Sequence, residues 1–239
     1  MRKFIVSIVC GLILCRAGVA SAKTVVYFIP HQDDEMYMLG SMTREIQVGN
    51  DVYAVMVTDG GRSEVRKKMS TEFMHTFTRQ EFSALRNKEF FRVLRIIGFA
   101  PTHILFANEG SLNGSPNPTY LDGHLTFEQA TEVIQNFYKQ HGDGVYATVL
   151  ADGGHGDHRM LHEALFNFTG PTEKIYYSEQ VAKGEKILLS KKEQQLKKKA
   201  LSIYYEWNPK KGAYAIAAHS VKKLLDFWDT HPYEYVSMK

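Results

Sequence analysis

Short apolar runs that alternate with helical patterns constrain this fold more than any other feature of the sequence. The first run, Thr24 to Ile29, is rich in β-branched and aromatic residues, which favour strands. Similar runs follow at residues 51–58, 102–107, 145–150 and 175–178. The segments between them carry apolar residues at helical spacing. This alternation predicts a single-domain, Rossmann-like α/β fold in which helices cover both faces of a mostly parallel sheet.

The segment after the first predicted strand is rich in groups that bind metals. His31, Asp33, Asp34 and Glu35 lie within five residues, just before a helical pattern begins. In open α/β sheets, ligand sites lie at the carboxyl ends of the strands. One histidine and three carboxylates at such a place predict a site for a divalent cation. The alternative is that Asp33 or Asp34 caps the helix, because carboxylates are favoured at helix N-termini.

A second segment with the same chemistry follows the fourth predicted strand. It contains His155, Asp157 and His158. Because parallel strands end on the same edge of a sheet, we expect the two segments to meet. Together they can supply two histidines and one carboxylate, which is the ligand set of a catalytic zinc site with an open position for water. Zinc lowers the pKa of bound water towards about 7, so hydroxide becomes available near neutral pH.

With these two segments in place, the sequence resembles the PIG-L/LmbE-like zinc-dependent N-deacetylases, which act mainly on N-acetylglucosamine-type sugars. The family pattern A-H-P-D-D-E appears here as residues 30–35, and H-P-D-H appears as residues 155–158. Gln32 and Gly156 replace the usual prolines, so we expect both loops to be looser. A Thr-x-Gly turn appears at residues 58–60, and the helix pattern R-x-x-E-x-x-x-A-x-x-x-L-G is matched by Arg86, Glu89, Val93, Ile97 and Gly98.

The resemblance implies a role for each residue of the two segments. His31, Asp34 and His158 would bind one zinc ion per chain. Asp33 would be the general base, and His155 would polarise the amide oxygen. These roles suit an acetamide, because this poor electrophile needs both an activated water and stabilisation of the oxyanion.

Four nearby residues complete the predicted site or leave alternatives open. We expect Asp157 to orient His155 and to keep it protonated. Glu35 either orients a ligand or lies in the first turn of a helix. His162 follows His158 by four residues and could bind metal in its place, although Asp34 already completes the set. Arg62 is predicted to bind substrate through sugar hydroxyls or a phosphate, and the alternative is an ordinary exposed arginine.

The N-terminal residues predict export. Arg2-Lys3 precedes the apolar run 4–14, and Ala20-Ser-Ala22 fits an A-x-A cleavage site. We therefore expect a signal peptide at residues 1–22, a deacetylase domain at residues 23–239, and a periplasmic or extracellular location. A retained N-terminal anchor is the alternative.

Without the predicted signal peptide, residues 1–22, the chain would have no net charge and no cysteine. Arg2, Lys3 and Arg16 account for three of the 29 basic residues, which leaves 26 against 26 acidic residues. A neutral chain gives no argument for nucleic-acid binding. Cys10 and Cys15 also lie in the predicted signal, so cysteine chemistry is not expected. The expected partner is a small molecule or glycan that carries an N-acetyl group, with no stable membrane insertion after cleavage.

Two other functions fit parts of the pattern. His31-x-Asp33 with a distant histidine also matches the triad of non-haem Fe(II) oxygenases, although those enzymes place it on an all-β barrel. The other alternative is a non-catalytic carbohydrate- or metal-binding module on the same fold. The presence of both Asp33 and His155 favours a catalytic site over such a module.

Overall fold

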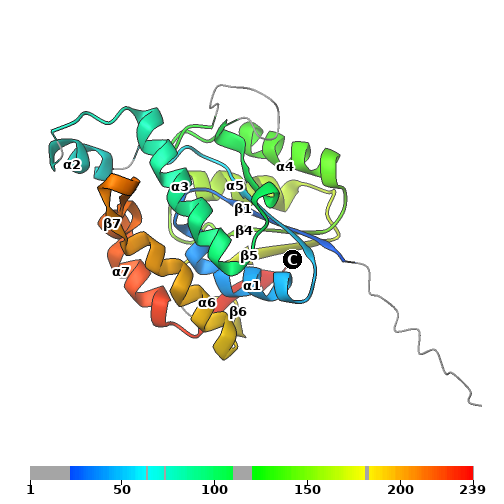
Figure 1. Ribbon diagram of the computed structural model, residues 1–239. Helices are drawn as coiled ribbons and strands as arrows, with labels where there is room; N and C mark the ends of the chain where they lie inside the picture. The colour runs from blue at the N-terminus through cyan, green and yellow to red at the C-terminus, as the bar shows by residue number, and fades with distance from the viewer. Residues whose placement is uncertain (1–21, 63, 73, 110–119, 181–182, 239) are drawn as a thin grey trace, which may run out of the picture.

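A computed structural model describes residues 22–62, 64–72, 74–109, 120–180 and 183–238 (Figure 1). The predicted signal peptide lies outside these residues except for its last position, Ala22. Within the described ranges, no helix is both long enough and apolar enough to cross a membrane.

A seven-stranded sheet with the order β3-β2-β1-β4-β5-β9-β6 forms the centre of the molecule. The strands that pair in parallel are β1 (Thr24–Ile29), β2 (Asp51–Met56), β3 (Ile104–Phe106), β4 (Val145–Val149) and β5 (Glu173–Tyr177). At the far edge, β9 (Tyr233–Met238) runs antiparallel to both β5 and β6 (Glu185–Leu188). The mostly parallel α/β fold predicted from the sequence is confirmed.

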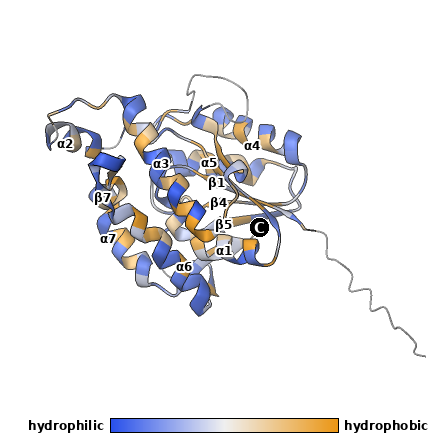
Figure 2. Cartoon of the chain, in the orientation of Figure 1, coloured by the Kyte–Doolittle hydropathy of each residue, from blue (hydrophilic) through white to orange (hydrophobic). Residues whose placement is uncertain are grey.

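Helices cover both faces of this sheet (Figure 1). Side chains of β1 alternate between two cores, with Val25, Tyr27 and Ile29 in one and Val26 and Phe28 in the other. The first core is covered by α1 (Leu39–Gln47), α3 (Arg79–Ile97), α6 (Lys191–Leu201) and α7 (Ile216–Thr230), and the second by α4 (Phe127–His141) and α5 (Gly156–Asn167). Figure 2 shows hydrophobic and hydrophilic segments alternating along α3, α4 and α7, as expected for helices that bury one face.

Short elements complete the fold. They are the helix α2 (Glu64–Glu72), the small strands β7 (Trp207–Asn208) and β8 (Ala213–Tyr214), and the 3₁₀ turns η1 (Asp34–Tyr37), η2 (Pro101–His103), η3 (Ala107–Glu109), η4 (Ser202–Tyr205) and η5 (Pro209–Lys211). Helix α2 lies in the polar segment that follows the turn at residues 58–60. This helix is held by Val65 and Met69, which lie one turn apart and are buried against Phe82 and Ile216.

Two acidic side chains cap helices that are distant in the sequence. Glu234, from β9, accepts hydrogen bonds from the backbone N of Gly40 (2.7 Å) and Ser41 (2.9 Å) at the start of α1. Glu89, from α3, accepts one from the backbone N of Ile216 (3.0 Å) at the start of α7. Both carboxylates are buried, so each fixes the position of a helix that has no side-chain cap of its own.

We predict that Glu89 makes stability depend on pH. Burial raises the pKa of Glu89 to about 7, above the value of 4.5 expected for the unfolded chain. This group therefore contributes stability that is complete below about pH 4.5 and is lost as the pH rises through 7. The loss should be roughly 3 kcal/mol, and it should be absent from Glu89→Gln.

Urea unfolding of both proteins between pH 4.5 and 8 measures this difference. Glu163→Gln is a matched control, because Glu163 is exposed on α5. It should retain the pH dependence of the parent protein. Parallel stability curves for the parent and Glu89→Gln would contradict the assignment.

Candidate active site

The two predicted segments meet where the strand order of the sheet reverses. From β1 the chain moves outwards to β2 and β3, whereas β4 lies on the other side of β1 and continues to β5. Ligands in open α/β sheets bind in the crevice at such a switch point. The residues after β1 and β4 line a cleft of about 520 Å³ there.

Three donor atoms from these segments converge in the cleft. His31 Nδ1 lies 3.1 Å from Asp34 Oδ2, His158 Nε2 lies 3.0 Å from the same oxygen, and the two ring nitrogens are 3.1 Å apart. All three side chains are buried. Ligand atoms around a tetrahedral zinc ion with bonds of about 2.0–2.1 Å are separated by roughly 3.3 Å, so this triangle has a suitable size.

Each of the two histidines directs its other ring nitrogen to a carboxylate. His31 Nε2 lies 3.0 Å from Asp157 Oδ2, and His158 Nδ1 lies 2.7 Å from Glu179 Oε1. If these nitrogens carry the protons, His31 Nδ1 and His158 Nε2 face Asp34 as acceptors. Three converging acceptor atoms would suit a cation, and carboxylate–histidine pairs are the usual support of metal ligands.

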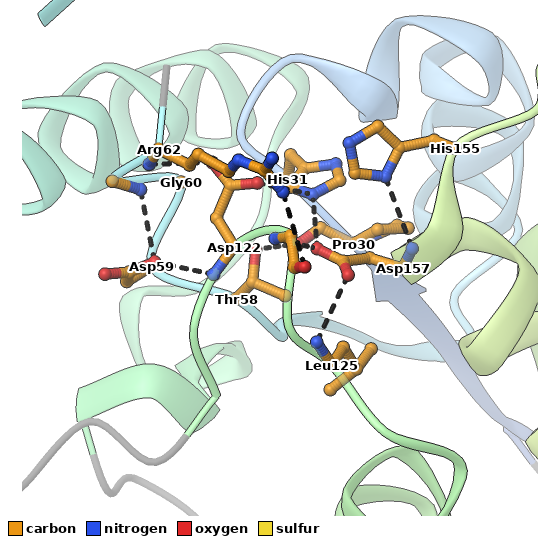
Figure 3. Close-up of polar contacts among 12 residues, drawn as sticks. Pro30, His31, Thr58, Asp59, Gly60, Arg62, Asp122, Leu125, His155 and Asp157 are labelled. Atoms are coloured by element: carbon orange, nitrogen blue, oxygen red, sulfur yellow. Dashed lines mark hydrogen bonds and ion pairs between the residues drawn. The ribbon is translucent and has the colours of Figure 1, made fainter.

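Asp157 supports a different histidine from the one expected. Its carboxylate contacts His31 and accepts hydrogen bonds from the backbone N of Gly123 (2.7 Å) and Leu125 (3.2 Å) (Figure 3). His155 meets only the backbone of this residue, because Asp157 N donates to His155 Nδ1 at 3.3 Å. The expectation that the Asp157 carboxylate orients His155 is therefore wrong. This carboxylate does favour the protonated ring, but burial and the neighbouring histidines outweigh it and lower the pKa of His155.

His155 is exposed and lines the cleft. Its ring centroid is 4.5 Å from that of His31. Partial burial is the largest cause that lowers the pKa of His155, and the neighbouring His31 and His158 act in the same direction. Because Nδ1 accepts a backbone hydrogen bond, the proton of the neutral ring is assigned to Nε2.

Asp33 is held in a strained backbone conformation and in contact with a cation. Its φ angle is 112°, a region that residues other than glycine rarely adopt. Its carboxylate lies 3.0 Å from Arg86 Nη2. Burial raises the pKa of Asp33 to about 6, and the Arg86 guanidinium opposes this shift. Strain that persists in a folded protein is typical of functional sites.

Arg86 and Gln32 tie the first loop to α3. The buried Arg86 guanidinium donates to the carbonyl oxygens of Gln32 and Gly60. The Gln32 side chain is also buried, and its Nε2 donates to Asn87 Oδ1 at 2.5 Å. The expectation that replacing proline by Gln32 loosens this loop is therefore wrong, because the glutamine side chain adds an anchor that proline cannot supply.

Glu35 supports Asp33 through a hydrogen bond to its backbone. It is fully buried, and Glu35 Oε2 accepts a hydrogen bond from Asp33 N at 3.0 Å. The Tyr204 hydroxyl donates to the other oxygen, Oε1. Burial raises the pKa of Glu35 to about 8. Glu35 lies in the first turn of η1, which was one of the two alternatives left open by the sequence. Its hydrogen bonds are to Asp33 and Tyr204 and not to a predicted metal ligand.

The remaining predicted residues differ in their placement. Arg62 is exposed and lines the cleft, and its backbone N donates to Asp122 Oδ2 at 3.0 Å. His162 instead packs edge-to-face on Tyr176, with ring centroids 4.7 Å apart, away from the residues that line the cleft.

Two acidic residues of the site are absent from the sequence prediction. Glu179 directly follows the fifth predicted strand, so its place at the carboxyl edge of the sheet was a usable signal. Asp122 Oδ1 lies 3.4 Å from His31 Nε2, but this residue comes from an irregular loop that gives no such signal. Donor atoms of His31, Asp122, His155 and Asp157 also lie within 4.8 Å of one another, as do those of His31, His155 and His158.

A family model described as PIG-L, GlcNAc-PI de-N-acetylase, matches residues 26–169, which is more than half of the chain. This chain belongs to the PIG-L family. The matched range includes both histidine segments and α3, so the resemblance inferred from the sequence is confirmed. No curated protein matches the sequence significantly.

Solved structures of similar fold include deacetylases. A deacetylase triple mutant from the teicoplanin biosynthetic pathway has 13% identity and a TM-score of 0.60, with coverage of 90% of this chain and 98% of that one. The N,N'-diacetylchitobiose deacetylase of Pyrococcus horikoshii has 19% identity and a TM-score of 0.58, with coverage of 92% and 84%.

The same fold also supports another reaction. The 4-carboxy-2-hydroxymuconate hydratase of Pseudomonas putida has 11% identity and a TM-score of 0.57, with coverage of 90% of this chain and 95% of that one. Similarity at this level establishes the fold alone. The reaction of this PIG-L protein must therefore be argued from its own side chains.

We predict that the Tyr204 hydroxyl stabilises the site. Tyr204→Phe keeps the ring but removes the donor to a fully buried carboxylate, and it should lower the free energy of unfolding by about 1–3 kcal/mol. Tyr205→Phe is the matched control. The Tyr205 hydroxyl also donates to a carboxylate, Asp226, but at an exposed position, so the loss should stay within about 0.5 kcal/mol. Equal losses in urea unfolding would argue against the Tyr204 contact.

Proposed function

We propose that this protein is a zinc-dependent hydrolase that removes the acetyl group from an N-acetylated amino sugar of the N-acetylglucosamine type or a related conjugate. One observation carries the proposal: His31 Nδ1, Asp34 Oδ2 and His158 Nε2 lie within 3.0–3.1 Å of one another, with a carboxylate behind each histidine. Family membership makes N-deacetylation the expected reaction. The diacetylchitobiose deacetylase of the same fold is a precedent for a sugar substrate.

His31, Asp34 and His158 would hold one zinc ion per chain. Two imidazoles and one carboxylate are a common ligand set for catalytic zinc. The sets that include His155 are less suitable, because that side chain is exposed and its Nδ1 accepts a backbone hydrogen bond. When bound, zinc supplies Lewis acidity and lowers the pKa of water.

Asp33 would be the general base. It would take a proton from the attacking water and pass a proton to the leaving nitrogen as the C–N bond breaks, which releases acetate and the free amine. A pKa of about 6 leaves Asp33 largely ionised at neutral pH while it remains a useful acid afterwards. The hydrogen bond from Asp33 N to Glu35 would hold the base in position.

His155 and Arg62 would act on other parts of the substrate. The assigned Nε2–H of His155 points to a role as a neutral donor to the developing oxyanion. Arg62, on the rim of the cleft, can donate to sugar hydroxyls. The oxygenase alternative is weakened, because it depended on an all-β barrel and this sheet is mostly parallel with helices on both faces.

We also propose that the protein is exported and acts in the periplasm or outside the cell. The support is the basic start, the apolar run and the Ala20-Ser-Ala22 site of the sequence. The mature N-terminus, determined by mass spectrometry on protein recovered from the cell exterior or periplasm, should be Lys23. A full-length chain in the cytoplasm would refute export.

Acetate release tests the reaction. The purified protein should release acetate from N-acetylglucosamine or a related N-acetylated sugar, lose this activity with a chelator and regain it with zinc. Failure across a panel of acetamido sugars and peptidoglycan fragments, with zinc bound, would instead favour the non-catalytic binding module.

We predict that Asp33→Asn keeps zinc but loses most activity. General-base catalysis typically contributes about 10²–10⁴-fold, so kcat should fall by that factor. Zinc content, measured on the same sample, serves as the control for an intact metal site. Turnover close to that of the parent protein would reassign the base.

We predict that His158→Ala loses zinc. The parent protein should bind about one zinc ion per chain, and this variant should bind it at least about tenfold more weakly. His162→Ala is the matched control, one helical turn further along α5, and it should keep the parent stoichiometry. Metal analysis and competition with a chromogenic chelator measure both. Zinc loss in His162→Ala alone would reassign the third ligand.

A further inference from the structure

One tyrosine hydroxyl in the cleft has no role in the proposed function. Tyr37 ends the 3₁₀ turn η1, three residues after Asp34, and lines the same cleft as His31 and His158. The residue is only 3% exposed. The described residues supply no hydrogen-bond partner for its hydroxyl. A buried polar group without a protein partner needs an explanation, and in a cleft the explanation can be a ligand.

The ring of Tyr37 belongs to the core, and its hydroxyl faces the cleft. The ring packs edge-to-face on the buried Trp228, with centroids 5.4 Å apart. The charged groups that act most strongly on the hydroxyl are the carboxylates of Asp34, Glu179 and Asp33, in that order. All three carboxylates line the cleft, so the hydroxyl end of the side chain points there.

This hydroxyl is a hydrogen-bond donor at neutral pH. Burial is the main cause that raises the pKa of Tyr37 well above its ordinary value of 10, and the nearby carboxylates act in the same direction. These carboxylates already have other partners. Asp34 lies against His158, Glu179 lies against the other nitrogen of the same ring, and Asp33 lies against an arginine. The proton of Tyr37 is thus available to a bound molecule.

The other donors on the cleft wall are either occupied or exposed. Arg86 donates to Asp33 and to two backbone carbonyl oxygens. Arg62 and Ser220 are exposed. Tyr37 is therefore a buried donor beside the predicted metal ligands. The acceptor that an acetamide brings to this position is its oxygen, which gains negative charge when water attacks the carbon.

We propose that Tyr37 is a further catalytic residue, whose hydroxyl donates a hydrogen bond to the acetamide oxygen as negative charge develops on it. His155 supplies one donor to this oxygen in the proposed function, and Tyr37 supplies a second from the loop after β1. The hydrogen bond involves no proton transfer, so the tyrosine stays neutral throughout. Tyr37 lies outside residues 30–35, which match the family pattern. This inference rests on the proposed deacetylase function.

Tyr37→Phe tests the contact, because it keeps the ring and removes only the hydroxyl. Loss of one donor to an oxyanion typically lowers kcat by about 10²–10³-fold. With N-acetylglucosamine as substrate, kcat should fall at least about tenfold, while KM stays within about twofold of the parent. The zinc content should be unchanged. The urea midpoint should not fall, because the hydroxyl has no protein partner to lose. A kcat within about twofold of the parent would overturn the proposal.

Tyr176→Phe is the matched control. Tyr176 is fully buried, and its hydroxyl likewise has no hydrogen-bond partner among the described residues. It does not line the cleft, so this variant should keep kcat within about twofold of the parent. An equal loss of kcat in both variants would refute a specific role for Tyr37.

A binding measurement separates this proposal from the deacetylase proposal. The probe is glucosamine with a methylphosphonyl group on its nitrogen, which replaces the planar acetyl carbon by a tetrahedral, anionic phosphorus. If zinc-loaded parent protein releases acetate from no acetamido sugar, the deacetylase proposal fails, and Tyr37 is judged on calorimetric binding of this probe. Binding at least about tenfold weaker in Tyr37→Phe than in the parent supports the contact. Equal binding, or no binding to the parent, overturns it.

Discussion

The parallel pairing of β1 with β4 is the interaction on which the site depends. Its register sets Val25 opposite Val145 and Tyr27 opposite Ala147, so the loops that follow these strands emerge side by side. One residue of slippage would displace one loop by about 3.3 Å along the strand and reverse the faces of its side chains. That displacement exceeds the 3.0–3.1 Å separations among the converging donor atoms. Burial of both faces of the sheet thus fixes the geometry of the converging donor atoms.

Helix α3 connects the loop after β1, which carries Asp33, to the start of α7. Arg86 holds Asp33 and the loop after β1, and Glu89, one turn later, holds the start of α7. Both side chains are buried, and each ends on a group that compensates for its desolvation. The R-x-x-E pattern of the family therefore has a structural role in this chain, because one helix fixes both Asp33 and the start of α7.

Much of this arrangement was accessible from local patterns in the sequence. The five parallel strands and the meeting of the two histidine segments follow from strand composition and the rule for strand ends. The choice of His31, Asp34 and His158 within those segments came from the resemblance to the PIG-L family. Contacts between residues that are distant in the sequence could not be predicted from these local patterns. The Asp157 carboxylate beside His31 is held by the backbone N of Gly123 and Leu125, which come from an irregular loop. The strand β9 was not predicted, because Glu234, which is buried to cap α1, interrupts its apolar pattern.

The cap that Glu234 places on α1 has a consequence for how the protein is made. The two partners are more than 190 residues apart, and Glu234 belongs to the last strand. During synthesis from the N-terminus, α1 gains this cap only after β9 has been made. A product truncated before β9 would keep every side chain of the candidate site and still lack the carboxylate that caps α1. Synthesis of β9 thus completes the helix that follows the first histidine segment.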